Sequence, residues 1–182
     1  ASMAAAVEQA WPTVELDGIV ITRYAHGLPT RAVRVVEAGH PVPDAAGEAA
    51  AREILDRVQK MRAGDLLLAL ISGGGSSLLS LPVPKVPMDD LKRVTRELLA
   101  SGAPIEQMNV VRKHLSQIAG GRLADAAVRC DARVLALIVS DVTGDAPTDI
   151  ASGPCTPDPS TYADALAILQ RWSVTPPASV AD

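Results

Sequence analysis

The chain has very few aromatic residues: they make up 2% of its 182 residues, and phenylalanine is absent. A chain of this length predicts one domain with a substantial core, which must therefore be built from leucine, valine, isoleucine and alanine. Aliphatic cores of this kind suit helices packed closely on a parallel β-sheet. The hydrophobic content of 48% is ordinary for a globular protein and excludes general disorder.

Other absences exclude classes of partner. The net charge is −4 and the basic residues are scattered, so the chain offers no basic field for nucleic acid. No apolar run approaches the roughly 18 residues that cross a bilayer, so we expect no membrane partner. The two cysteines, Cys130 and Cys155, lie far apart and form no metal or redox motif. We therefore expect a reduced, cytoplasmic protein.

Short apolar runs alternate with helical patterns along the chain. The strands are predicted at 19–22, 33–36, 65–71 and 133–140, and the main helices at 45–61, 88–100, 105–117, 122–128 and 161–172. The segment 135–139 is apolar on both faces, as expected of a central parallel strand. This alternation predicts an α/β fold with a mostly parallel sheet.

The most informative segment is an apolar strand that ends in three consecutive glycines. Glycines leave room for close approach and can adopt positive φ, so successive backbone amides can converge on one anion. Neighbouring serines add hydroxyl donors, and ligands of open α/β sheets bind at the carboxyl ends of strands. The predicted site for phosphate or carboxylate comprises Ser72, Gly73, Gly74, Gly75, Ser76 and Ser77.

The established phosphate motifs do not fit this segment. It lacks the Gly-Lys-Ser/Thr of a Walker A loop, and Leu78 stands where Gly-x-Gly-x-x-Gly requires its third glycine. The serine-hydrolase elbow fails at the same residue. A plain tight connection between strand and helix is the alternative interpretation.

A second polar segment lies in the predicted helix 105–117. Asn109, Arg112 and Lys113 are three to four residues apart, so they share one face of that helix. Arg112 can bind phosphate or carboxylate oxygens as a fork, and Lys113 can contribute a mobile charge. The alternative is a solvated helix face.

A third polar segment follows the last predicted strand. Asp141 is a candidate to hold Mg²⁺, directly or through water, or to accept the proton of an attacking hydroxyl, with Asp145 in support. Aspartates that only form turns are the alternative. The small-residue turn 151–154 can let backbone approach a ligand.

Taken together, these segments resemble the type 2 glycerate kinases, the family associated with the MOFRL domain, many of whose members are labelled hydroxypyruvate reductase. The matching segments are 37–44, 71–79, 101–102, 109–114, 120–124 and 140–154. The resemblance implies a Rossmann-like, three-layer α/β/α fold. It also implies that 1–182 is most of the amino-terminal domain of a two-domain enzyme, without an upstream segment and without the carboxyl-terminal MOFRL domain.

The activity implied by the resemblance is ATP-dependent phosphorylation of D-glycerate to 2-phosphoglycerate, with ATP and Mg²⁺ as cofactors. Arg112, Lys113 and Asp141 would be catalytic, while residues 72–77, Asn109 and Asp145 would bind substrate or phosphate. Glycerate and ATP would be the small-molecule partners, and a homodimer is possible. We expect the isolated chain to be inactive, because half a cleft cannot close on both substrates.

Two other functions stay open. One is an NAD(P)H-dependent hydroxypyruvate reductase, although the dinucleotide fingerprint is missing. The other is a noncatalytic domain that binds phosphate or an organic acid. The chain also departs from the family pattern: Ala119 replaces a lysine, Thr143 a proline and Cys155 a threonine, and the family's upstream lysine would fall at or before Ala1.

Overall fold

The computed structural model describes residues 1–142 and 144–181, so Thr143 lies outside the described residues. Its elements, in chain order, are α1 (Ser2–Ala10), β1 (Gly18–Arg23), β2 (Val33–Ala38), α2 (Ala45–Val58), β3 (Leu66–Ile71), α3 (Gly75–Leu78), α4 (Met88–Ser101), α5 (Ile105–His114), α6 (Arg122–Val128), β4 (Arg133–Ile138), the 3₁₀ helix η1 (Ile150–Ser152), α7 (Tyr162–Arg171) and α8 (Ala178–Ala181).

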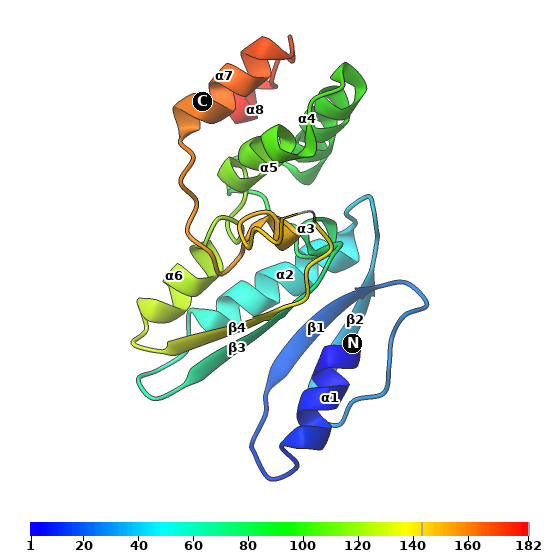
Figure 1. Ribbon diagram of the computed structural model, residues 1–182, viewed down its shortest axis with the longest axis vertical. Helices are drawn as coiled ribbons and strands as arrows, with labels where there is room; N and C mark the ends of the chain where they lie inside the picture. Colours follow the sequence, from blue (N-terminus) through cyan, green and yellow to red (C-terminus); the bar gives the residue numbers. More distant parts are fainter. Residues whose placement is uncertain (143, 182) are drawn as a thin grey trace.

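The strands form two parallel pairs. β1 pairs with β2, with Gly18 opposite Val33, and β3 pairs with β4, with Leu66 opposite Arg133. Among the described residues each pair is a separate two-stranded sheet. The α/β class and the parallel pairing are therefore confirmed, while the single sheet that the sequence suggested is split in two. The carboxyl ends of β3 and β4 both lead toward α3 and η1 (Figure 1).

Helices α2 and α6 cover one face of both pairs (Figure 1). Their buried side chains form an aliphatic core with residues of β1, β3 and β4 packed against it. On the other side α1 lies against β1 and β2 (Figure 1), and its Glu8 carboxylate accepts hydrogen bonds of 2.6–2.8 Å from the amides of Arg31, Ala32 and Val33. The three-layer arrangement is thus present at the first strand pair.

The second strand pair departs from the expectation of burial on both faces. Leu135, Leu137 and Val139 are 43%, 42% and 56% exposed, whereas Ala136 and Ile138 pack against a small core around Ile71. The reason is that, within the described part of the chain, no helix covers the second face of β3 and β4 (Figure 1). The apolar pattern identified a strand correctly but not the number of its covered faces.

A second helical group consists of α4, α5 and α7, which pack around their own aliphatic core beyond the sheet (Figure 1). Helix α5 ends at His114 rather than at 117, because the chain turns there to join another segment. Ser116 forms an isolated bridge with Pro82, and its hydroxyl accepts hydrogen bonds from the amides of Ile118 and Ala119. None of the helices in the described residues has the length and apolarity that a bilayer-spanning segment requires.

Candidate functional site

The triglycine turn connects β3 to α3 at the carboxyl end of the strand. Gly74 is left-handed, with φ of 79°, and is the residue that precedes α3. Gly73 and Gly75 do not have positive φ. Backbone conformation therefore requires a glycine at only one of these three positions, and the other two need another reason.

That reason is close contact with three different segments. A β-carbon on Gly73 would lie 1.9 Å from Asp141 Oδ2, one on Gly74 would lie 2.8 Å from His40 Nε2, and one on Gly75 would lie 2.5 Å from Ala151 Cβ. Real β-carbons do not come so close to other atoms. The three glycines thus let side chains from the ends of β2 and β4 and from η1 reach the backbone of one turn.

Four amides of this turn make no hydrogen bond within the described part of the chain. Within the described residues, none of the hydrogen bonds that the chain makes comes from the amides of residues 73–76. The amides of Ser77 and Leu79, in contrast, donate to the carbonyls of Gly74 and Gly75 at 3.3 and 2.8 Å. Free successive amides can bind an anion.

The three serines of the predicted site differ in what they can offer. Ser72 is exposed, and the Ser76 hydroxyl lies 2.8 Å from the hydroxyl of Ser152. Ser77 is buried, and its hydroxyl donates to the Gly74 carbonyl at 3.1 Å. The Ser77 hydroxyl therefore stabilises the turn by donating its proton within it. Ser72 and Ser76 are better placed to bind a ligand.

Arg112 enters a cavity beside the turn, where α3, α4, α5 and η1 meet. The cavity is lined by Ser76, Ser80, Arg112, Ser116, Ala119 and Ser152, among others. Arg112 is half-buried, and it makes no hydrogen bond or ion pair with any residue that the structure describes. Burial lowers the pKa of Arg112, but a guanidinium stays charged in proteins. A half-buried cation without a counter-ion, surrounded by hydroxyls, is suited to bind an anion.

Lys113 does not have the place that the sequence suggested. It is only 4% exposed, and its Nζ lies 3.6 Å from Oδ1 of Asp158, whose side chain is 7% exposed. The expectation of a mobile charge at Lys113 is therefore not met, because a buried ammonium paired with a carboxylate cannot move through a cleft. Nothing in the sequence signalled Asp158, which lies between two prolines and looks like an ordinary turn residue.

Asp158 also contacts the residues around it. It accepts hydrogen bonds from the amide and hydroxyl of Ser160 at 3.1 and 2.7 Å, and its Oδ2 lies 3.9 Å from His114 Nε2. Burial acts to raise the pKa of Asp158, but the hydrogen bonds from Ser160 and the charge of Lys113 lower it below its usual value. The cluster of Lys113, His114, Asp158 and Ser160 ties α5 to the segment that leads into α7.

Asn109 is buried, with 5% of its surface exposed, and its Oδ1 accepts no hydrogen bond from the described residues. The alternative of a solvated face thus fails for Asn109 and Lys113, whereas only Arg112 reaches the cavity. The substrate-binding role of Asn109 stays a prediction.

Asp141 and Asp145 are both exposed. Asp141 lies against Gly73, whereas Asp145 has a φ of 52° and donates its amide to the Val142 carbonyl at 3.3 Å. Among the described residues, no group of three His, Cys, Asp or Glu side chains is arranged to hold a metal. One carboxylate beside an anion cradle still fits Mg²⁺, which is commonly bound by one or two carboxylates together with substrate phosphates and water.

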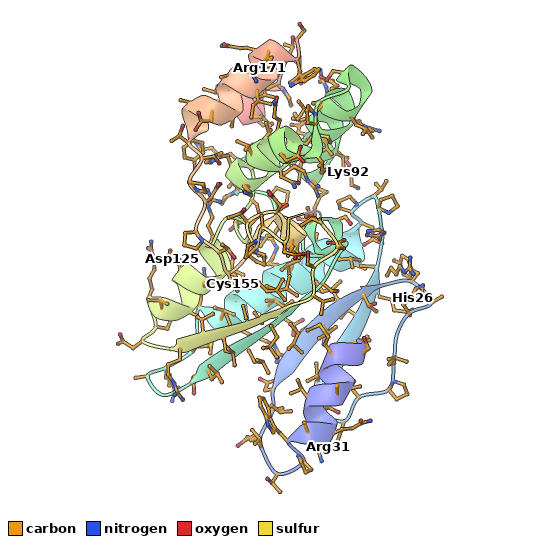
Figure 2. The ribbon with its side chains drawn as sticks, viewed as in Figure 1. His26, Arg31, Lys92, Asp125, Cys155 and Arg171 are labelled. Carbon is orange, nitrogen blue, oxygen red and sulfur yellow. The ribbon has the colours of Figure 1, made fainter. Side chains whose placement is uncertain are left out.

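The turn at η1 brings backbone close to the site, as its small residues suggested. Ala151, Ser152 and Gly153 are all left-handed, with φ of 53°, 59° and 58°. The carbonyls of Ser152 and Gly153 accept from the amides of Gly120 and Gly121 at 3.0 and 2.7 Å. Nearby, burial raises the pKa of the Cys155 thiol to about 11, so this cysteine, shown in Figure 2, is not a reactive thiolate at neutral pH.

Comparison with known proteins places this geometry in context. The chain is 53% identical over 179 residues to a "putative hydroxypyruvate reductase" of Agrobacterium vitis, covering 98% of this chain and 40% of that protein. It is 45% identical over 164 residues to the "D-glycerate 2-kinase" of Thermotoga maritima, covering 90% of this chain and 39% of that protein. The chain therefore spans about 40% of the length of these relatives.

A solved structure agrees with the sequence relatives. The crystal structure of a glycerate kinase from Thermotoga maritima superimposes with a TM-score of 0.92 at 43% identity, covering 98% of this chain and 43% of that one. The resemblance stated from the sequence is confirmed. A family profile described as "Domain of unknown function (DUF4147)" matches residues 1–182, and the chain belongs to this family.

Proposed function

We propose that this chain is part of an enzyme that transfers the γ-phosphoryl group of ATP to D-glycerate, giving 2-phosphoglycerate and ADP. The observation that carries the proposal is the guanidinium of Arg112, which has no partner among the described residues and lies in a cavity that Ser76 of the turn also lines. The amides of residues 73–76 likewise make no hydrogen bond within the described part of the chain. The relatives named D-glycerate 2-kinase and glycerate kinase support the choice of substrates.

Phosphoryl transfer requires positioning and charge neutralisation more than covalent chemistry. The amides of 73–76 and the hydroxyls of Ser72 and Ser76 would hold phosphate oxygens. Arg112 would bind a phosphate or the carboxylate of glycerate as a fork. Lys113 would act indirectly, because its pairing with Asp158 fixes the helix that carries Arg112.

Asp141 would receive the proton of the attacking hydroxyl. As the hydroxyl oxygen of glycerate bonds to the γ-phosphorus, the bond to the ADP oxygen breaks and the proton passes to the Asp141 carboxylate. The alternative role for Asp141, supported by Asp145, would be to hold Mg²⁺, directly or through water, and this ion would neutralise charge on the phosphates. The contact of Asp141 with Gly73 supports this role, because it places the carboxylate beside the cradle.

We further propose that the chain is most of the amino-terminal domain of a longer, cytoplasmic, two-domain protein, whose remaining part closes over the site. The fraction of each relative that the chain spans supports this proposal. The 182 residues alone would then turn over little or no substrate, because closure is needed to exclude water from the transferring group. Whether two such proteins form a homodimer stays a prediction.

The test is ADP release from ATP and D-glycerate by the full-length enzyme, with Arg112→Ala and Asp141→Asn as variants. We expect turnover by the wild type and a loss of about a hundredfold or more in kcat/KM for each variant. Normal rates in both variants would refute the roles assigned to the two residues. Tight binding of phosphate or glycerate without any turnover would instead identify a noncatalytic binding protein.

One alternative has a specific finding in its favour. The Agrobacterium vitis relatives, at 53% and 49% identity, carry the name putative hydroxypyruvate reductase. Hydride transfer would require a nicotinamide cofactor, and the triglycine turn lacks the dinucleotide fingerprint. NADH or NADPH oxidation by the full-length enzyme with hydroxypyruvate, without ADP release from glycerate and ATP, would establish the reductase and overturn the kinase.

A further inference from the structure

His40 is a residue of the site to which the sequence patterns assign no role. We propose that His40 Nε2 binds the same phosphate group as the amides of the triglycine turn, as a further positioning residue. This inference rests on the proposed function, because it extends the phosphate site described there. It adds a ligand from the segment that follows β2, which the proposed mechanism does not otherwise use.

The geometry brings the ring edge to the turn. β2 ends at Ala38, and Gly39 and His40 continue across to the loop that follows β3. A β-carbon on Gly74 would lie 2.8 Å from Nε2, 3.1 Å from Cδ2 and 3.7 Å from Cε1 of His40. Nε2 is therefore the ring atom that comes nearest to the turn, and it is an atom that can donate a hydrogen bond.

The ring is available for a ligand. His40 is exposed, and neither of its nitrogens makes a hydrogen bond with any residue in the described part of the chain. His114 is different, because it is buried beside Asp158 and packs on the ring of Tyr162 at 4.6 Å between centroids. The imidazole of His40 thus lies beside a turn whose amides 73–76 make no hydrogen bond with the described residues.

The segment that presents His40 is held in place. The Asp44 carboxylate accepts hydrogen bonds from the Gly47 amide at 2.9 Å and from the Tyr24 hydroxyl at 2.7 Å. The backbone also folds tightly here, because a β-carbon on Gly39 would lie 2.5 Å from the Val42 carbonyl oxygen. A backbone segment fixed before the ligand arrives loses less conformational freedom on binding, which favours the use of His40 as a ligand.

The chemistry favours phosphate over the carboxylate of glycerate. A phosphate group has enough oxygens to meet several backbone amides, a guanidinium and an imidazole at once, whereas a carboxylate has two. Asp141 lies against the neighbouring Gly73. The His40 imidazole and the Asp141 carboxylate therefore lie against adjacent residues of one turn. A phosphate held by His40 would be close to the group that receives the proton.

The experiment uses ¹⁵N-labelled 182-residue chain titrated in separate series with inorganic phosphate and with D-glycerate. We follow the ring nitrogens of His40 and the amides of residues 73–76 by NMR. Phosphate should shift both sets of resonances, and His40→Ala should weaken phosphate binding about tenfold. His40→Gln, which retains a side-chain donor, should recover part of this loss. His26→Ala is the matched control, since His26 is an exposed histidine at the outer edge of the molecule (Figure 2).

Each other outcome overturns the proposal. If phosphate shifts the amide resonances of residues 73–76 but not the ring resonances of His40, and if His40→Ala binds phosphate normally, the role of His40 is refuted and the phosphate site stands. If D-glycerate but not phosphate shifts the His40 resonances, the ring serves the organic acid. If nothing shifts, the cradle and His40 are both refuted. Because this measurement needs no turnover, a failure of the kinase assay is distinguishable from a failure of His40.

Discussion

The carboxylate of Asp141 lies directly on the backbone of Gly73, so close that a β-carbon at position 73 would be 1.9 Å from Oδ2, 2.3 Å from Cγ and 2.9 Å from Cβ. This contact joins the ends of β3 and β4, the two strands whose carboxyl ends define the site. Position 73 is therefore fixed as glycine by the neighbouring strand and not by its own φ, which is not positive. Any side chain there must displace the proposed proton acceptor.

The first prediction concerns this contact. Gly73→Ala should displace Asp141, reduce kcat of the full-length enzyme at least a hundredfold and lower the free energy of unfolding by about 1 to 3 kcal/mol through overpacking. Gly18→Ala is the control, because its β-carbon would meet only Val33 methyl groups at 3.8 Å. Turnover and urea unfolding measure the two effects. An active Gly73→Ala enzyme would show that the position of Asp141 is irrelevant to turnover.

The second prediction is that Arg112 contributes to phosphate binding but lowers the stability of the folded chain. Arg112→Met keeps an unbranched apolar stem and removes a half-buried charge that has no partner among the described residues, so the free energy of unfolding should rise by on the order of 1 kcal/mol. Binding of phosphate should fall in the same variant. The urea midpoint of the 182-residue chain and a phosphate titration report the two changes.

Arg57→Met is the matched control for Arg112. Arg57 is an exposed arginine that pairs with Glu53 and Asp17. Its replacement should cost stability slightly, by about 1 kcal/mol or less, and leave phosphate binding unchanged. A loss of stability in Arg112→Met as large as or larger than in Arg57→Met would mean that the guanidinium has a structural partner, and would contradict the assignment of Arg112 as a free anion ligand.

Local patterns predicted those features that depend on neighbouring residues in the chain. The strand before the triglycine turn, the helix that carries Arg112, and the aspartate after β4 all lie where periodicity and turn chemistry placed them. The carboxyl ends of neighbouring parallel strands lie at the same edge of a sheet, and this rule predicts that the turn and Asp141 lie close together. The contact of Asp141 with Gly73 agrees with that prediction.

Features that depend on packing between distant segments were not predictable in this way. Nothing local shows that Lys113 meets Asp158, 45 positions further along the chain, or that His40 reaches Gly74. The exposed face of β4 is a similar case. An apolar run such as 135–139 indicates burial, but which faces are covered depends on elements elsewhere in the protein.

The third prediction tests the pair of Lys113 and Asp158. Asp158→Asn should lower the free energy of unfolding by about 3 to 5 kcal/mol, because it leaves the buried Lys113 ammonium without a counter-charge. The control is Asp125→Asn, on the outer side of α6 (Figure 2), which breaks an exposed pair with Arg129 at 2.8 Å. That change should cost about 1 kcal/mol or less. Equal costs, measured by urea unfolding, would show that Lys113 is not desolvated.

The fourth prediction concerns pH and His114. Burial lowers the pKa of His114 below its ordinary value of 6.5, and Arg122 and Lys113 act in the same direction against the opposing charges of Asp158 and Asp164. Below pH 6.5 the unfolded chain therefore binds more protons than the folded one, so the free energy of unfolding falls as the pH falls toward the folded pKa. The contribution of His114 is fully present above pH 6.5.

The measurement is the urea midpoint of the 182-residue chain at several pH values between 7.5 and 5, a window around the ordinary pKa of histidine. The wild type should lose stability on acidification through this window, and His114→Gln should lose clearly less. His26→Gln, which alters an exposed histidine, should retain the wild-type dependence. A wild-type slope in His114→Gln would assign the pH dependence to other groups and would show that the cluster around Asp158 accommodates a charged imidazole without cost.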